Sequence, residues 1–213
     1  MKSIHRSQLA STDHNHSGKS SLLSTLLRII DLDSGTIWID GSDLSLVPRD
    51  IVRSKLVVIP QDGFILSGSV RINADPTQTI TDERIIAAMQ KVQLWNALQE
   101  RGGLDAEMNK QPLSQGQQQL FCLGRALCRT ESKILILDEA TSSTNIDTDN
   151  LMRNLIRTEF KDHTIITVAH RLDTIMESDK VAILEKGSLV EFGDPRVLLQ
   201  NGTALKRLYQ HGG

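Results

Sequence analysis

The stretch Lys133–Thr141 constrains the fold of this chain more than any other. Four apolar residues in a row, Ile134 to Leu137, end in the two carboxylates Asp138 and Glu139. A short run of this kind predicts a strand buried on both faces, as in a parallel sheet. Two acidic side chains at its end are costly to bury unless they meet a cation or water. Because ligands bind at the carboxyl ends of strands in open α/β sheets, we expect a metal and phosphate site here.

A possible phosphate-binding part of such a site is the segment Ser17-Gly18-Lys19-Ser20-Ser21. It precedes residues 22–30, whose apolar spacing predicts a buried helix. Gly-Lys-Ser at a helix start is the second half of a P-loop, in which backbone N–H groups and the helix dipole bind phosphates. In that motif Lys19 reaches the β- and γ-phosphates, and the Ser20 hydroxyl binds magnesium. The motif has a glycine where this chain has Asp13, so an ordinary exposed helix start is the alternative.

The composition excludes several classes of function. Of 213 residues, 24 are Lys or Arg and 26 are Asp or Glu, and the formal net charge is −2. Without a basic run, binding to nucleic acid or anionic lipid through bulk charge is not expected. Cys122 and Cys128 fall in one predicted helix and form no disulfide framework, which favours a reducing compartment. No apolar run approaches the ~20 residues of a membrane span, so the sequence predicts a soluble, cytosolic-facing protein.

The order of the remaining elements predicts an α/β fold. Apolar runs at 55–60, 133–138 and 164–169 are expected to be buried strands of a mostly parallel sheet flanked by helices, as in P-loop NTPases. Residues 36–44 and 181–192, each with a glycine-containing turn, predict a small antiparallel β part. A helical lobe is expected at about 62–130, inserted in one domain that spans 1–213. The polar residues 1–16 give no strand or helix signal.

The pentapeptide Leu113-Ser114-Gln115-Gly116-Gln117 leads directly into a predicted buried helix, residues 118–129. A serine and a glycine before a helix present backbone N–H groups to an oxyanion or a phosphate. An ordinary helix N-cap is the alternative, and for this pentapeptide taken alone it is the more frequent outcome.

Polar side chains directly follow three of the predicted strands: Gln61, the pair Asp138-Glu139, and His170. In a parallel sheet these positions share one edge, and Gly18-Lys19-Ser20 would begin a helix at the same edge. One edge would then combine a cation, carboxylates, an amide and an imidazole. This set of groups is what the hydrolysis of a nucleoside triphosphate requires.

Each residue of this set has a predicted role at a magnesium-bound nucleotide. Asp138 would hold magnesium through water, and Gln61 would contact the magnesium and the water. Glu139 would polarise the attacking water, because a carboxylate near the γ-phosphate can act as a general base. His170 would form a hydrogen bond with the γ-phosphate and orient Glu139. The predicted metal-binding residues are therefore Ser20, Gln61 and Asp138.

In this order, the motifs resemble the nucleotide-binding domain of an ABC transporter, from about Ser17 to the C-terminus. The resemblance lies in Gly-Lys-Ser at 18–20, Gln61, Leu-Ser-Gln-Gly-Gln at 113–117, Ile-Leu-Ile-Leu-Asp-Glu-Ala-Thr at 134–141, and His170. Segments 102–107 and 118–123 further resemble the second nucleotide-binding domain of multidrug-resistance-associated (C-type) exporters. The resemblance implies ATP and Mg²⁺ as cofactors. It implies ATP contacts from Ser17, Gly18, Lys19, Ser20, Ser21 and Gln61, and catalysis by Glu139 and His170.

The resemblance also implies partners. Two such domains pair head to tail, so that the signature residues Ser114, Gln115, Gly116 and Gln117 would lie at ATP bound by the second nucleotide-binding domain. The pair would act on the transmembrane domains of an exporter at the cytoplasmic face of a membrane, and no nucleic acid is expected. ABC-type DNA-repair ATPases are disfavoured because the sequence has no heptad run. P-loop helicases are disfavoured by the signature.

Departures from the family pattern favour a second interpretation. Asp13 and His16 stand where the family's loop has glycine, which allows positive φ and close backbone approach. No aromatic residue precedes Trp38, although the family has an adenine-stacking tyrosine before the loop, and Asn145 replaces a usual aspartate. The alternative is a truncated, non-catalytic relic that keeps the fold but binds ATP poorly, such as a fragment or a misread gene start. A metal site of Asp13, His14 and His16 is a minor alternative because no cysteine is near.

Overall fold

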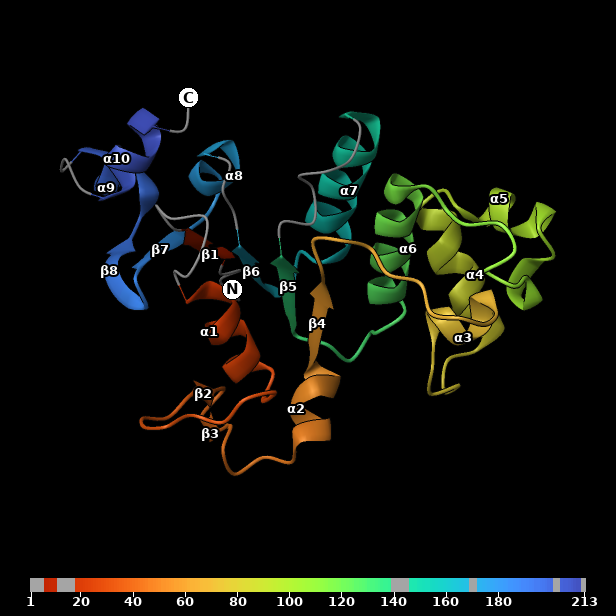
Figure 1. The fold of residues 1–213 in the computed structure, drawn as a ribbon, viewed down its shortest axis with the longest axis horizontal. Helices are drawn as coiled ribbons and strands as arrows, with labels where there is room; N and C mark the ends of the chain where they lie inside the picture. The colour runs from red at the N-terminus through yellow and green to blue at the C-terminus, as the bar shows by residue number, and fades with distance from the viewer. Residues whose placement is uncertain (1–5, 11–17, 139–145, 169–171, 201–203, 212–213) are drawn as a thin grey trace. The chain divides into compact units, whose positions relative to one another are not determined.

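Figure 1 shows the computed structural model, which describes residues 6–10, 18–138, 146–168, 172–200 and 204–211. The chain divides into two compact units. The first consists of residues 1–57, 131–136 and 163–213, and the second of residues 58–130 and 137–162. The first unit holds most of the β structure, and the second is mainly helical.

The main sheet is built around the apolar runs that the sequence predicted. Its described strands are β1 (Arg6–Ala10), β4 (Leu56–Ile59), β5 (Ile134–Asp138), β6 (Thr164–Val168), β7 (Lys180–Glu185) and β8 (Ser188–Gly193). Their order across the sheet is β4-β5-β6-β1-β7-β8. β1 pairs in parallel with β6 and with β7, whereas β8 pairs antiparallel with β7. The predicted α/β fold with a mostly parallel sheet and a small antiparallel part is confirmed.

Strand β1 is the main departure from the sequence prediction, which gave residues 1–16 no strand. Residues Arg6–Ala10 lie between β6 and β7, with Arg6 opposite Ile165 and Ser7 opposite Lys180. The hydrogen bonds of a parallel ladder use the backbone, so a polar segment can pair between two strands of stronger β propensity. The prediction for these residues is therefore wrong, and a strand precedes the Gly-Lys-Ser motif.

The first unit also contains short helices and a separate hairpin. The helices are α1 (Lys19–Leu26), α2 (Arg49–Lys55), α8 (Leu172–Met176), α9 (Pro195–Gln200) and α10 (Ala204–His211). In the hairpin, β2 (Trp38–Ile39) pairs antiparallel with β3 (Ser42–Asp43). Asp40 and Gly41 join them with φ values of 49° and 78°, as a type I′ turn requires. The predicted tight turn at Asp40-Gly41 is confirmed.

The second unit is mainly helical, and its two longest helices pack against each other. Its elements are α3 (Val70–Ala74), α4 (Asp82–Lys91), α5 (Trp95–Glu100), the 3₁₀ helix η1 (Gly103–Asp105), α6 (Gln115–Leu127) and α7 (Ile146–Glu159). In α6, Phe121 and Leu123 are fully buried. Gly124 lets α4 approach closely, since a Cβ there would lie 3.0 Å from Cε of Met89. Helix α7 carries Asp147 and Asp149 in its first turn, where acidic side chains are favourable to the helix dipole.

The carboxylate of Asp75 organises the loop between α3 and α4. Asp75 is 4% exposed, and its carboxylate accepts hydrogen bonds from the backbone N–H groups of Thr77, Thr79 and Ile80 at 3.1, 2.5 and 2.7 Å. The Thr77 hydroxyl donates a further bond at 2.6 Å. Burial by itself raises the pKa of the Asp75 carboxyl, but the hydrogen bonds together outweigh burial and leave that pKa below its ordinary value.

We expect Asp75→Asn to destabilise the protein at neutral pH, because hydrogen bonds to a charged group contribute roughly 1.5–3 kcal/mol. The folded-state pKa is lowered, so the carboxylate's contribution is present above the unfolded pKa of about 4 and is lost as pH falls through the folded pKa. Urea unfolding should show a difference between wild type and variant at pH 7 that shrinks below about pH 4. The exposed Asp162→Asn is the control, and an equal loss at all pH values would contradict the prediction.

Candidate functional site

Gly18 and Lys19 form the start of α1 in a way that suits an anion. Gly18 is the N-cap with a φ of 90°, a left-handed conformation that favours glycine. A Cβ on Gly18 would also lie 3.2 Å from Cα of Gly187. The first turn contains no acidic residue, and the N-cap Gly18 has no side chain with which to cap the N–H groups. The positive end of the helix dipole and these backbone donors therefore fit a phosphate.

Lys19 differs from the other lysines of the described residues in its burial. Lys19 is only 6% exposed, whereas the neighbouring Ser20 and Ser21 are exposed. Lysine is almost never fully buried without a partner for its charge. A lysine at the first position of a helix whose N-cap is glycine suits the second half of a P-loop, in which the ammonium and the backbone N–H groups bind phosphate.

Gln61 and Asp138 lie at the ends of neighbouring strands. Gln61 follows the last residue of β4 by two positions, and Asp138 is the last residue of β5. β4 and β5 are adjacent in the sheet, and their arrows point the same way in Figure 1. Asp138 is partly buried and Gln61 is exposed. The second unit therefore has a carboxylate and an amide on adjacent strand ends.

The other predicted site residues fall in different parts of the chain. Gly18, Lys19, Ser20 and Ser21 belong to the first unit, and Gln61, Asp138 and the signature belong to the second. Outside the described residues are Ser17, Glu139 and His170, together with Asp13, His14, His16 and Asn145. The roles assigned to all of these residues from the sequence stay predictions.

Ser114 is the N-cap of α6, which confirms the capping interpretation of the signature pentapeptide. Its hydroxyl oxygen accepts a hydrogen bond from the Gln117 N–H at 3.3 Å, and Gln117 Oε1 accepts one from the Ser114 N–H at 3.0 Å. This reciprocal pair is a capping box. Ser114 and Gln115 are exposed. The Ser114 hydroxyl keeps its own proton for donation, so capping leaves it able to bind an anion.

Gln119 is a feature of this region that the sequence reasoning missed. Its side chain is fully buried, and its Nε2 donates to the carbonyl oxygen of Gln61. The sequence contained one signal: a glutamine directly before the apolar residues Leu120 and Phe121 on a helix predicted to be mostly buried. A polar side chain at such a position needs a hydrogen-bond partner, and the partner lies far away in the sequence.

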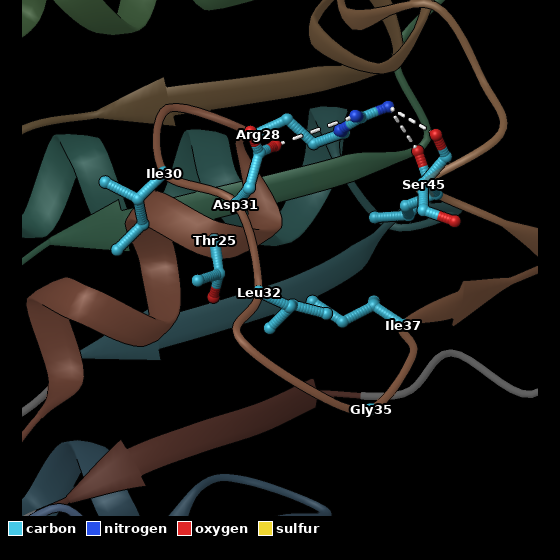
Figure 2. Close-up of a pocket in the computed structure, with 9 residues that line it drawn as sticks. Thr25, Arg28, Ile30, Asp31, Leu32, Gly35, Ile37 and Ser45 are labelled. Carbon is cyan, nitrogen blue, oxygen red and sulfur yellow. Dashed lines mark hydrogen bonds and ion pairs between the residues drawn. The ribbon is translucent and has the colours of Figure 1, made fainter.

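A cavity of about 280 Å³ lies in the first unit near the end of α1 (Figure 2). Arg28 crosses its wall and donates from Nη1 to the carbonyl oxygens of Leu44 and Ser45 at 2.6 and 3.2 Å. The cavity is lined by Thr25, Arg28, Ile30, Asp31, Leu32, Gly35, Ile37, Leu44 and Ser45. None of these lining residues is a predicted site residue.

The described residues fit a magnesium ion that arrives with a phosphate group. Among them, no three His, Cys, Asp or Glu side chains are grouped to hold a metal ion by themselves. Mg²⁺ commonly keeps several waters and binds one or two carboxylates together with substrate phosphates. Ser20, Gln61 and Asp138 each carry a side-chain oxygen, the kind of ligand that Mg²⁺ prefers, and their joint role at one metal ion stays a prediction.

Comparisons with known proteins identify the family. A sequence-family model described as ABC transporter matches residues 10–142. The chain belongs to the ABC transporter family. ABC multidrug transporter B of Aspergillus fumigatus is 46% identical over 194 residues, covering 91% of this chain and 13% of that protein. ATP-binding cassette sub-family C member 2 of Homo sapiens is 47% identical over 186 residues, covering 86% of this chain and 12% of that protein.

The fold comparison agrees with the family. A solved structure of a bacterial Atm1-family ABC exporter with ATP bound matches with a TM-score of 0.86 and 27% identity, over 97% of this chain and 36% of that chain. The chain thus spans about 13% of the length of the curated relatives. The predicted family is confirmed, and the finer assignment to a second nucleotide-binding domain of C-type exporters stays a prediction. No helix in the described ranges is long and apolar enough to cross a membrane.

Replacing Ser114 separates its capping role from any role at a nucleotide. We expect Ser114→Ala to reduce the free energy of unfolding by about 1 kcal/mol, because the Gln117 N–H loses its acceptor. Ser114→Asn should recover most of this loss, since asparagine is an equally good N-cap. Urea unfolding of both variants measures the difference. An equal loss in the two variants would show that capping is not what Ser114 contributes to stability.

Proposed function

We propose that this chain is the ATP-binding and ATP-hydrolysing module of an ABC-type exporter. The observation that carries the proposal is the start of α1, where Gly18 adopts φ of 90° and Lys19 is 6% exposed. Domains of the family in general bind ATP, commonly with Mg²⁺. Family membership and the adjacent strand ends of Gln61 and Asp138 support the same function.

The proposed roles follow the chemistry of each residue. The N–H groups of α1 and the Lys19 ammonium bind the β- and γ-phosphates and offset their charge. Ser20, Gln61 and Asp138 hold Mg²⁺, which when bound neutralises phosphate charge. Glu139 orients the attacking water and takes its proton as a general base. His170 forms a hydrogen bond with the γ-phosphate and orients Glu139.

The proposed partner is a second nucleotide-binding domain in a head-to-tail pair. The signature at Ser114–Gln117 supports this, because Ser114 and Gln115 are exposed at the positive end of the long helix α6. ATP bound by the second domain would lie at this helix start. The pair would act on the transmembrane domains of an exporter, which places the chain at the cytoplasmic face of a membrane.

A second candidate function is a non-catalytic ABC domain that keeps the fold but binds ATP poorly. The sequence observation that favours it is Asp13 and His16 at positions where the family's phosphate-binding loop has glycine. A wild type that does not bind ATP, together with an Asp13→Gly/His16→Gly variant that does, would favour this candidate over an intact ATPase. Micromolar binding by the wild type would exclude it.

We expect Lys19→Met to abolish ATP binding, because the substitution removes the ammonium and keeps an unbranched apolar side chain in a buried position. Isothermal titration calorimetry with Mg²⁺–ATP should give micromolar affinity for the wild type and at least a hundredfold weaker binding for the variant, about 2.8 kcal/mol at about 1.4 kcal/mol per tenfold. The exposed Lys161→Met, with circular dichroism spectra for all proteins, is the control. Unchanged binding by Lys19→Met would remove Lys19 from the site.

We expect Glu139→Gln to bind Mg²⁺–ATP as the wild type does and to lose ATP turnover. The amide preserves the size of the side chain but cannot accept a proton from water at neutral pH. Loss of a general base typically lowers the rate about 10²–10⁴-fold, and release of phosphate under saturating ATP measures it. Turnover equal to that of the wild type would show that another group acts as the base.

A further inference from the structure

The segment that follows Gln61 lies directly on the backbone of α6. An ideal Cβ on Gly63 would lie 2.7 Å from the carbonyl carbon of Gln118 and 2.9 Å from its oxygen. A helix backbone cannot give way as the end of a flexible side chain can, so this contact requires glycine at position 63. The loop and the helix are therefore in contact without side chains between them.

Gln119 holds the carbonyl groups of the same segment. Its Nε2 donates to the carbonyl oxygen of Gln61 and also lies 3.4 Å from that of Pro60. These two acceptors fix the orientation of the amide, because the rotated amide would place Oε1 against two carbonyl oxygens. Oε1 is buried and has no hydrogen-bond partner among the described residues. A buried oxygen with no partner lowers stability, so stability alone does not explain a glutamine here.

Arg125, further along α6, holds the next part of the segment. Its Nη2 donates to the carbonyl oxygen of Phe64 at 3.3 Å, and its guanidinium carbon lies 4.8 Å from the centroid of the Phe64 ring. A cation over an aromatic face at this distance is attractive. Arg125 Nε also donates to the carbonyl oxygen of Asn73 at 2.8 Å. Arg125 therefore connects α3 as well as residues 61–66 to α6.

Asn73 holds the other end of the segment, at Leu66. It is fully buried, and its Oδ1 accepts from the Leu66 N–H at 2.7 Å while its Nδ2 donates to the Leu66 carbonyl at 2.9 Å. Residues 61–66 are thus held by Gln119 at the start, by Arg125 in the middle and by Asn73 at the end. All of these groups lie in the second unit, and two of them are on α6.

The same helix carries the signature at its start. Ser114 and Gln119 are five positions apart in or next to α6, and at 1.5 Å per residue this is roughly 7.5 Å of rigid helix. A displacement of Gln61 that retains its attachment must therefore move the helix start that presents Ser114. The two groups are joined through hydrogen-bonded backbone and one side-chain amide.

We propose that Gln119 is a positioning residue: its buried amide sets the place of Gln61 and couples Gln61 to the signature at the start of α6. This inference rests on the proposed function, in which Gln61 contacts Mg²⁺ bound with ATP. Gln119 itself touches neither nucleotide nor metal. It acts through the Gln61 carbonyl, so its loss should change how the site responds to Mg²⁺ and leave the binding of metal-free ATP unchanged.

The test uses Gln119→Met, which keeps the length of the side chain and removes the amide. Hydrogen exchange of the amides of residues 61–66, measured without nucleotide, should become about tenfold faster, as expected for one lost hydrogen bond. The Mg²⁺ concentration that half-maximally tightens ATP binding should rise about tenfold, the size of effect seen for groups that orient metal ligands. ATP affinity in EDTA should equal that of the wild type, and Gln61→Ala/Gln119→Met should be no worse than Gln61→Ala.

Gln90→Met is the control, because Gln90 is an exposed glutamine on α4 of the same unit and receives the same change of side chain. Its exchange at 61–66 and its Mg²⁺ response should match the wild type. If Gln119→Met does not fold, Gln119→Asn, one methylene shorter, replaces it. A folded Gln119 variant with wild-type hydrogen exchange and a wild-type Mg²⁺ response would overturn the positioning role of Gln119 and leave the proposed function untouched. A wild type that does not bind ATP would overturn the proposed function, and with it the role of Gln119.

Discussion

The burial of β5 between β4 and β6 is the constraint on which the rest of the structure depends. Its residues Ile134 to Leu137 are at most 9% exposed, and burying each such side chain contributes about 1.5–3 kcal/mol relative to leaving it exposed. A shift of this strand by one residue would bring Asp138 into the sheet interior, where an unpaired carboxylate is costly. The apolar run thus fixes the register of the strand. The register then requires the acidic residue to lie where the strand ends.

In the second unit, the structure depends in a similar way on helix α6, because this helix contacts segments that are distant in the sequence. Its start is capped by Ser114, its buried side includes Phe121 and Leu123, and its polar residues hold the segment after Gln61. Packing alone would be satisfied by apolar residues at every buried position. The buried amide of Gln119 reduces the apolar contact and leaves one oxygen without a partner, so its contribution lies in the position of Gln61 and not in the stability of the core.

The parts of this structure that could be predicted from sequence are those encoded locally. Apolar runs predicted the strands β4, β5 and β6. The glycine-containing turn at Asp40-Gly41 predicted the hairpin, and the serine before α6 predicted the N-cap of that helix. Strand β1 could not be found in this way, because its polar residues pair with β6 and β7, more than 150 positions later in the chain. The role of Gln119 could not be predicted for the same reason, because its hydrogen-bond partner Gln61 is 58 positions away. At the candidate site, residue types and spacing predicted the site residues, and those assignments stay predictions. The contacts that hold the Gln61 segment could not be predicted, because they join residues distant in the sequence.

Family membership and ATP binding depend on different residues, so one does not guarantee the other. The fold depends on backbone ladders and apolar burial, whereas phosphate binding depends on the charge and the backbone freedom of the loop before α1. A residue other than glycine in a left-handed conformation costs about 1–2 kcal/mol. A carboxylate about 4 Å from one phosphate charge costs about 4 kcal/mol at an effective dielectric constant of 20, which is roughly a thousandfold in affinity. By these estimates a carboxylate at that distance would weaken ATP binding more than the loss of glycine geometry does. Whether this chain is an active ATPase depends mainly on whether the Lys19 ammonium and the N–H groups of α1 offset that one carboxylate.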